Sequence, residues 1–340
     1  MSTIVTRTAQ PDDERNWVAI YGTPVSHSVA PSLFDVIFPS VGLPKHKYTT
    51  VDCPSLLEAD NAWEKATKQP NFLGSCVTMP LKLQAVDKVD ELTPAAQALG
   101  SVNTTFLRHN ADGSVTHVGT NLDTAGVGNS LLTALLSTPT PFPAEAPRRF
   151  APGTASALMI GGGGATRAAI WAMNSIGLSP IYLINRDASE TAAIVAQFPD
   201  LDLRPLETVE QVQQELEATE KQGIRLAAGT GAIPSIEPQT DAEKNVYEVA
   251  KRVFEWPYRP KTGKPAEDGV ISLPSKPVFL EMAYKPRMTI MRKIAEDRNW
   301  QTICGVEVVL EGCFEQAKLW TGVEISLETR EAGRKVLRQE

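Results

Sequence analysis

The chain has 340 residues, of which 42% are hydrophobic and 21% are charged, so we expect it to bury a real core and to be soluble, not disordered or membrane-embedded. The length favours two domains of ordinary size. Acidic residues outnumber basic ones by 40 to 33, which gives a net charge of −7 and argues against nucleic acid as a partner, because no basic surplus can displace counterions from phosphates.

Signals for export, membrane insertion and metal binding are weak. The first residues lack the apolar core of a secretory signal, so we expect a cytoplasmic protein with no membrane partner. The longest uncharged stretch, 168–185, contains Gly177 and Pro180 and is typical of a helix, a turn and a buried strand. Because no C-x-x-C spacing occurs, we expect no metal site and reduced thiols at Cys53, Cys76, Cys304 and Cys313.

Short apolar runs alternate with helix-like stretches in the first half of the chain. The predicted elements are strands at 17–22, 47–53 and 74–79 and helices at 30–42 and 55–69. Such alternation is typical of parallel strands in an α/β sheet. A helix at 123–137 then leads into a proline-rich stretch at 138–153, which we interpret as a connection between domains.

The segment 155–187 is the most informative part of the chain. An apolar strand leads into four glycines, a helix follows, and a second strand ends in a polar triplet. Glycine permits a tight turn and lets a pyrophosphate approach the N–H groups at a helix N-terminus, where the helix dipole favours negative charge. The alternative is a tight turn without a ligand, because the full G-x-G-x-x-G pattern is absent. The context predicts a Rossmann-type dinucleotide site at Gly161, Gly163, Gly164 and Ala165.

The residues after the second strand indicate which dinucleotide binds. In the triplet that begins with Asn185, Arg186 can pair with a 2′-phosphate or stack on the adenine. Asp187 can accept from a free 2′-hydroxyl or cap the following helix, and both roles can hold together. Glu190 adds a second negative charge where a phosphate would lie. We therefore predict NAD as the cofactor, with NADP as the alternative.

Four short motifs precede the glycine run. They are Gly22-x-Pro24-x-x-His27-Ser28-x-x-Pro31, Gly74-x-x-Val77-Thr78-x-Pro80-x-Lys82, Ser101-Val102-Asn103-Thr104 and Gly119-x-Asn121-x-Asp123-x-x-Gly126. In order and spacing, these motifs and the glycine run resemble the shikimate dehydrogenase family over about residues 17–325. The segments 231–244, 281–289 and 319–322 are most similar to its fungal quinate dehydrogenase branch.

The resemblance implies a two-domain α/β fold. Residues 1–137 would form an N-terminal α/β catalytic domain, and residues 154–305 a Rossmann-type NAD(P)-binding domain with a surface insertion at 256–277. The C-terminal helix, within 306–340, would return to pack on the first domain, and the substrate would lie in a cleft between the domains. The sequence does not indicate an oligomeric state.

The resemblance assigns the catalytic role to Lys82 and Asp123. Oxidation of a secondary alcohol needs a base beside the hydroxyl, because a proton leaves the oxygen as a hydride leaves the carbon. Burial in a cleft would let Lys82 exchange a proton near neutral pH, well below its free pKa of about 10.4. Asp123 would hold the lysine and bond the same hydroxyl. From the residues alone, Lys82 is interpreted as a solvated surface lysine.

Polar side chains elsewhere match the family's substrate contacts. Ser28 would contact a carboxylate, Asn103 would contact a ring hydroxyl, and Tyr284 would close over the carboxylate. Thr78 would be a further hydrogen-bonding group for the substrate. From the residues alone, Ser28 and Asn103 can be helix caps, Thr78 can bond at a strand edge and Tyr284 can be a core tyrosine. Two further cofactor-binding positions are implied, Thr230 and Gly305.

The sequence departs from the family pattern at several positions of the predicted substrate pocket. Ala30 removes a hydroxyl, Cys76 replaces an asparagine, and Phe34-Asp35 replaces a His-Asn pair. Gly312 stands where the family has a glutamine, although Gln316, one helical turn later on the same face, can supply an amide. Because the catalytic pair is retained, these departures suggest altered specificity more than lost chemistry.

The sequence therefore predicts an NAD(P)-dependent dehydrogenase that acts on quinate, shikimate or a related small hydroxy-carboxylate. The alternative is a ligand-sensing or regulatory relative with weak or no turnover. The departures in the substrate pocket favour this alternative, whereas the retained lysine and aspartate argue against it.

Overall fold

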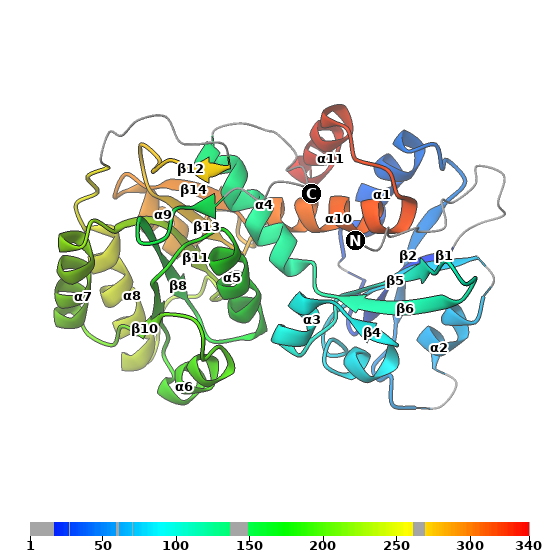
Figure 1. The fold of residues 1–340 in the computed structure, drawn as a ribbon, viewed down its shortest axis with the longest axis horizontal. Coiled ribbons are helices and arrows are strands. Elements are labelled where there is room, and N and C mark those ends of the chain that lie inside the picture. The colour runs from blue at the N-terminus through cyan, green and yellow to red at the C-terminus, as the bar shows by residue number, and fades with distance from the viewer. Residues whose placement is uncertain are drawn as a thin grey trace. The chain divides into compact units, whose positions relative to one another are not determined.

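A computed structural model describes residues 17–26, 28–58, 61–69, 71–136, 149–260 and 269–339. The chain forms two compact units (Figure 1). Unit 1 comprises Met1–Ala125 and Val309–Glu340, and unit 2 comprises Gly126–Val308. The predicted fold class is confirmed, including the C-terminal helix that returns to the first unit. Most of the predicted proline-rich connection and residues 261–268 of the predicted insertion lie outside the described residues.

Unit 1 contains a mixed six-stranded sheet with the order β2-β1-β3-β5-β6-β4. Its strands are β1 (Trp17–Gly22), β2 (Lys47–Asp52), β3 (Phe72–Val77), β4 (Glu91–Leu92), β5 (Thr104–His109) and β6 (Val115–Thr120). Strands β1, β2 and β3 are parallel, as the alternating pattern predicts. Strand β5 instead runs antiparallel to both β3 and β6. The reason is local: the turn between β5 and β6 contains Gly113 at a φ of 85°, and this tight turn makes a hairpin.

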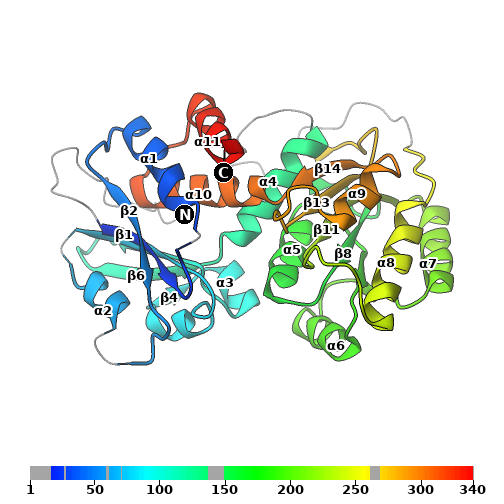
Figure 2. The ribbon, with the colours of Figure 1, turned by 180° about the vertical axis from the view of Figure 1, so that it is seen from behind.

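Helices cover both faces of this sheet. They are α1 (Ala30–Ser40), α2 (Ala62–Thr67), η1 (Gln84–Lys88), α3 (Pro94–Leu99) and α11 (Leu327–Gln339). Helices α1 and α11 lie on one face, and α2 and α3 on the other (Figure 2). The helix expected at 55–69 is shorter because Asn61 caps it, accepting from the Glu64 N–H. Gly333 permits close packing of α11 on α1, since a Cβ there would lie 2.7 Å from Leu33 Cδ1.

Unit 2 contains a parallel six-stranded sheet with the order β10-β9-β8-β11-β13-β14. Its strands are β8 (Ala155–Ile160), β9 (Ile181–Ile184), β10 (Leu203–Pro205), β11 (Arg225–Gly231), β13 (Val278–Glu281) and β14 (Gln301–Cys304). With β8 taken as strand 1, this is the order 3-2-1-4-5-6 of a dinucleotide-binding Rossmann sheet. The predicted Rossmann-type sheet is therefore confirmed.

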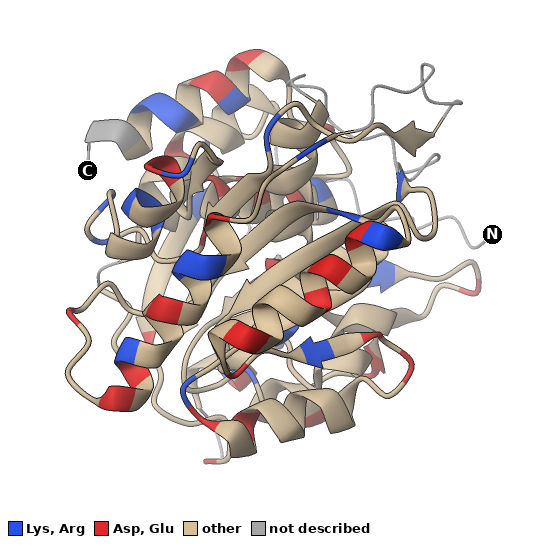
Figure 3. Ribbon diagram, turned by 90° about the vertical axis from the view of Figure 1, so that its left-hand side faces the viewer, with Lys and Arg blue, Asp and Glu red and all other residues tan. Residues whose placement is uncertain are grey.

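The helices of unit 2 are α5 (Gly164–Ser175), α6 (Ala188–Gln197), α7 (Val209–Lys221), α8 (Asp241–Phe254) and α9 (Ile290–Glu296). Helices α7 and α8 cover one face of the sheet and α5 the other (Figures 1 and 2). Acidic residues run along the outer side of α7 and a lysine stands at its end (Figure 3). No helix in the described part of the chain is long and apolar enough to cross a membrane.

The boundaries between the units fall inside two helices. They are α4 (Asp123–Leu136) and α10 (Val306–Thr321). The chain therefore leaves unit 1 before the predicted proline-rich connection. Short strands β7 (Arg149–Phe150) and β12 (Val270–Ile271) pair in parallel, so the end of that connection is joined to the predicted insertion.

Candidate active site

The four N-terminal motifs meet at one edge of the unit 1 sheet. Because β1 and β3 are parallel, the loops after Gly22 and Val77 leave at the same edge. The antiparallel strands β5 and β6 bring the residues before Thr104 and after Thr120 to that edge as well, since these two threonines are register partners. Strand direction thus gathers motifs that are far apart in the chain.

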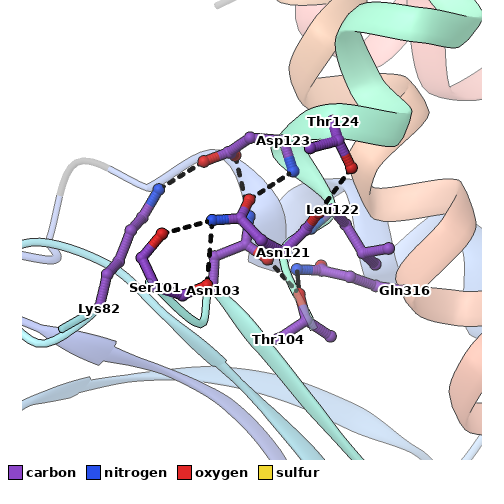
Figure 4. Close-up of polar contacts among 9 residues, drawn as sticks. All are labelled: Lys82, Ser101, Asn103, Thr104, Asn121, Leu122, Asp123, Thr124 and Gln316. Atoms are coloured by element: carbon purple, nitrogen blue, oxygen red, sulfur yellow. Dashed lines mark hydrogen bonds and ion pairs between the residues drawn. The ribbon is translucent and has the colours of Figure 1, made fainter. Parts of the chain in front are cut away.

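The lysine and the aspartate that the sequence singles out form an ion pair at this edge (Figure 4). Lys82 Nζ lies 2.6 Å from Asp123 Oδ2. Asn103 Nδ2 donates to the other oxygen, Oδ1, at 2.9 Å. The Lys82 main chain is held in turn, because its carbonyl accepts from the Val102 N–H at 2.9 Å. The Asp123 carboxylate therefore binds both the Lys82 ammonium and the Asn103 amide.

The backbone around Asp123 is held by Asn103 and by side chains that sequence reasoning did not select. Asn121 Oδ1 accepts from the Asp123 N–H at 3.1 Å, while Asn121 Nδ2 donates to Ser101 Oγ at 3.0 Å. Asn103 Oδ1 accepts from the Leu122 N–H at 2.8 Å and from Thr104 Oγ1 at 3.0 Å. Ser101, Thr104 and Asn121 belong to the motifs already quoted, so their positions in those motifs were the available signal.

The pKa of the Lys82 ammonium is higher than burial alone would make it. Burial by itself lowers the pKa of the ammonium, but the charge of Asp123 and its hydrogen bond outweigh that effect and raise the pKa above its ordinary value of 10.5. The expectation of proton exchange near neutral pH is therefore wrong for the protein without substrate. The reason is the partner at 2.6 Å, because an opposite charge at that distance favours the charged form.

Ser28 and Thr78 lie in the loops at this edge. Ser28 Oγ accepts from the Ala30 N–H at 3.3 Å, a serine turn just before α1, whose N-cap is Val29 and has no side-chain cap among the described residues. The Thr78 N–H donates to the Tyr21 carbonyl at 2.8 Å, and the Thr78 carbonyl accepts from the Leu81 N–H at 2.8 Å. These bonds shape the turn that leads to Lys82.

Gln316 on α10 reaches the network from the C-terminal part of unit 1. Its Nε2 donates to Thr104 Oγ1 at 3.0 Å, and its buried Oε1 has no nitrogen or oxygen hydrogen-bond donor among the residues that the structure describes. One turn earlier, a Cβ at Gly312 would come no closer than 3.9 Å to the Leu122 carbonyl, so space is open there. Cys76 on β3 lies against Gln316 and Tyr48, and its pKa is raised by burial.

Phe34 is not a pocket residue, contrary to the sequence interpretation. Its side chain is fully buried and stacks on Tyr48 with ring centroids 4.6 Å apart, and it also contacts Phe38 and Trp320. The neighbouring Asp35 is exposed and pairs with Lys47 at 3.0 Å. This departure from the family pattern is a feature of the core, because helix periodicity turns Phe34 inward.

The glycine run of unit 2 makes the expected strand-to-helix turn. Gly161 adopts a φ of 127°, and a Cβ there would lie 3.0 Å from the Ala232 carbonyl, so the turn needs glycine. Gly163 is the N-cap of α5, whose first residues are Gly164 and Ala165, and no side chain caps this helix. The first N–H groups of α5 are thus open to an acceptor.

A cavity of about 340 Å³ lies beside this turn. Its lining includes Gly162, Gly163, Asn185, Arg186, Glu190 and Glu243. The cavity and the uncapped helix fit the pyrophosphate and adenosine of a dinucleotide, because backbone donors and polar acceptors converge on one apolar-walled space.

Asp187, in the polar triplet after β9, caps the next helix, which is one of the two roles predicted for it. Asp187 Oδ1 caps α6, accepting from the Ser189 N–H at 2.8 Å and the Glu190 N–H at 3.2 Å. Arg186 Nη1 lies 2.7 Å from Glu243 Oε1 on α8. Of the two roles left open for Asp187, helix capping is the one that its contacts describe.

The remaining predicted residues of unit 2 occupy three settings. Thr230 is fully buried in β11, and its hydroxyl lies 3.6 Å from Met173 Sδ, so its side chain belongs to the core. Gly305 allows a close approach of backbones, since a Cβ there would lie 2.1 Å from the Met282 carbonyl oxygen. Tyr284 is half-buried in the loop after β13.

Comparison with known proteins agrees with the motifs. Residues 20–105 match the family model described as the shikimate dehydrogenase substrate binding domain. This segment is similar to the substrate-binding domain of shikimate dehydrogenases. The matched segment holds Lys82 and Asn103, and the resemblance inferred from the motifs is confirmed.

Solved structures of shikimate and quinate dehydrogenases share the fold of this chain. The dehydroquinate dehydratase and shikimate dehydrogenase AroM from S. pombe is 28% identical with a TM-score of 0.72, covering 95% of this chain and 53% of its own, so the chain spans about half of that protein. Shikimate 5-dehydrogenase from Thermus thermophilus, in complex with NADP(H) and shikimate, is 23% identical with a TM-score of 0.63, covering 95% of this chain and 100% of its own. Quinate dehydrogenase from Corynebacterium glutamicum, in complex with NAD, is 17% identical with a TM-score of 0.65, covering 95% and 98%.

Proposed function

We propose that the chain is a nicotinamide-dependent dehydrogenase that acts on a ring hydroxyl of quinate, shikimate or a related cyclohexane carboxylate. The observation that carries the proposal is the Lys82–Asp123 pair at 2.6 Å, held at the sheet edge where the polar motifs converge. The likeness to shikimate and quinate dehydrogenases supports an oxidoreductase of this kind.

The protein's own groups supply proton chemistry. A nicotinamide, when bound, accepts a hydride from the substrate carbon or returns one to it. In oxidation, neutral Lys82 takes the hydroxyl proton and becomes an ammonium; in reduction, the ammonium gives its proton to the carbonyl oxygen. Because Asp123 raises the pKa of Lys82, the ammonium dominates at neutral pH, which suits reduction. Asn103 positions Asp123 through their 2.9 Å hydrogen bond.

Substrate contacts are proposed for the polar groups around this pair. Ser28 and Thr78 lie in the loops at the same edge, and the buried Oε1 of Gln316 has no nitrogen or oxygen donor in the described part of the chain. These neutral groups suit a polyhydroxylated ring, whose hydroxyls both donate and accept. Tyr284, in unit 2, is proposed as the contact to the substrate carboxylate.

The dinucleotide is proposed to bind at the glycine turn of unit 2. Gly161, Gly163, Gly164 and Ala165 would hold the pyrophosphate, because the N-terminus of α5 presents free N–H groups and positive dipole. The ribose would lie near the triplet 185–187. NAD is favoured over NADP because the carboxylate of Glu190 lines the cavity.

The proposal is tested by mixing the purified protein with quinate, shikimate or dehydroshikimate and either nicotinamide cofactor, and following absorbance at the reduced nicotinamide band. We expect turnover, and we expect Lys82→Met to lower kcat by roughly 10²–10⁴-fold, the usual contribution of acid–base catalysis, while NAD still binds. Lys47→Met is the matched control, because Lys47 is an exposed lysine that pairs with Asp35.

Absence of turnover with every combination would reject the dehydrogenase. If a ring carboxylate still raised the melting temperature, the ligand-sensing alternative would take its place. The specific observation in its favour is the pair of altered positions, Cys76 and Gly312, beside Gln316.

A further inference from the structure

Arg186 is already paired within the cavity proposed for the dinucleotide. Its Nη1 lies 2.7 Å from Glu243 Oε1, although the arginine side chain is 64% exposed. An arginine just after the second strand of a Rossmann sheet is placed to pair with a 2′-phosphate. In this chain the carboxylate of Glu243 pairs with the arginine where a 2′-phosphate would.

Glu243 is itself held in place by the backbone. Its Oε2 accepts from the Gln239 N–H at 2.9 Å and from the Thr240 N–H at 3.1 Å, which forms the capping box of α8. These backbone hydrogen bonds, with a further contribution from Arg186, lower the pKa of Glu243 to about 2. The carboxylate is therefore charged and oriented at neutral pH.

The surroundings of the arginine are acidic. Among the described residues that line this cavity, Arg186 is the one cation, and the carboxylates are Glu190, Glu237 and Glu243. Glu190 Oε2 accepts from Asn185 Nδ2 at 3.2 Å, close to the glycine turn. A phosphate dianion entering here would face three carboxylates and one arginine that is already neutralised, which is unfavourable at such short range.

We propose that Glu243 is the residue that makes this site select a free 2′-hydroxyl over a 2′-phosphate, because it occupies the guanidinium of Arg186. The inference rests on the proposed function, namely that unit 2 binds a nicotinamide dinucleotide. The inference assigns the discrimination between NAD and NADP to Glu243 on α8, and not to Asp187, whose Oδ1 caps α6.

The test is calorimetric titration of NAD, NADP and 2′,5′-ADP into the wild type, three single variants and one double variant. Glu243→Gln keeps a side-chain oxygen for the capping box and removes the charge, so it frees Arg186. We expect this variant to bind NADP and 2′,5′-ADP at least about tenfold more tightly than the wild type does, because Arg186 can then form a charge-assisted hydrogen bond to the 2′-phosphate. Its affinity for NAD should change little. Glu237→Gln is the matched control, because it removes one charge from the same cavity and leaves the ion pair intact; its NADP affinity should change less than about threefold.

Arg186→Gln gives a second and independent signature. In the wild-type background it should leave NADP affinity nearly unchanged, because the guanidinium is already occupied, whereas in the Glu243→Gln background it should abolish the gain. This variant also keeps the inference testable if Glu243→Gln folds poorly.

The outcomes separate the two proposals. Two results would overturn the role of Glu243: an unchanged ratio of NADP affinity to NAD affinity in folded Glu243→Gln, or a loss of NADP affinity above about tenfold in Arg186→Gln alone. In either case, binding of NAD would leave the proposed function standing. If the wild type binds neither NAD nor NADP, the proposed function itself fails.

Discussion

At the scale of single residues, the charge of Lys82 is decided by one neighbour. Its side chain is 34% exposed, and burial works against the ammonium, yet Asp123 at 2.6 Å reverses the direction of the pKa shift. The same carboxylate also accepts a hydrogen bond from Asn103. The protonation state of Lys82 is therefore a property of the pair.

The pH dependence of alcohol oxidation should follow this pair. Oxidation needs the neutral amine, so the wild-type rate should still be rising in the alkaline range as the ammonium loses its proton. Asp123→Asn removes the charge that raises the pKa of Lys82, and burial then lowers that pKa, so the profile should move to lower pH with a smaller kcat. The measurement is kcat/KM against pH; Asp35→Asn, which alters an exposed ion pair, is the control. An unmoved profile in Asp123→Asn would contradict the assignment of Lys82 as the titrating group.

At the scale of elements, the end of β13 carries a buried acid. Glu281 is 1% exposed, and burial raises its pKa from 4.5 to about 7. Its carboxyl accepts from the Ala283 N–H at 3.4 Å and from Thr289 Oγ1 at 3.3 Å, so it ties the loop after β13 to the start of α9. Arg292 contributes a smaller opposing effect on the pKa.

The stability of unit 2 should therefore fall as pH rises from about 4.5 to about 7. The folded state keeps the Glu281 proton in this window while the unfolded chain has lost it, so the unfolded state binds fewer protons. The ceiling on this loss is roughly 3 kcal/mol, from 1.36 kcal/mol per pKa unit. Urea unfolding at pH 5 and pH 8 should show that Glu281→Gln flattens the dependence and that Glu210→Gln, on an exposed face, does not. Equal pH dependence in the wild type and Glu281→Gln would refute the raised pKa.

Helices α10 and α11 are joined by a buried ion pair in unit 1. Arg330 Nη1 lies 2.6 Å from Glu311 Oε2, both side chains are less than one-tenth exposed, and the guanidinium sits 4.8 Å from the centre of the Phe314 ring. Removal of one partner would leave a buried charge without compensation.

Glu311→Ala should lower the free energy of unfolding by about 3–5 kcal/mol because Arg330 loses its buried partner. Asp35→Ala, which breaks the exposed pair with Lys47, should cost less than about 1 kcal/mol. Denaturant unfolding measures both. Replacement of both Glu311 and Arg330 by methionine should restore most of the free energy of unfolding that Glu311→Ala loses. If the double variant is as unstable as Glu311→Ala, the buried-charge explanation is wrong.

At the scale of the whole molecule, the two units differ in how far sequence patterns describe them. The strand–glycine–helix segment of unit 2 is predicted closely, because periodicity and turn residues act within a few positions. In unit 1 the predicted parallel strands are confirmed, but the β5–β6 hairpin was not predicted, since strand direction depends on pairing partners and a turn at Gly113.

The candidate site divides in the same way. Lys82, Asp123 and Asn103 stand in motifs, and a resemblance in order and spacing singles them out. Thr104 and Asn121 are in the same motifs, yet only their hydrogen bonds reveal that they hold Asp123 and Asn103. A sequence motif identifies residues but does not show which of them are in contact.

The sequence by itself determined the fold class and the glycine turn, because strand and helix periods and turn glycines are local properties, and it pointed to Lys82 and Asp123 only through the resemblance of its motifs to a known family. The tertiary structure decided that Lys82 stays charged, that Phe34 is core and that Arg186 already has a partner in Glu243. Each of these depends on a distance between residues far apart in the chain, and electrostatic and packing energies depend on that distance and not on separation along the sequence.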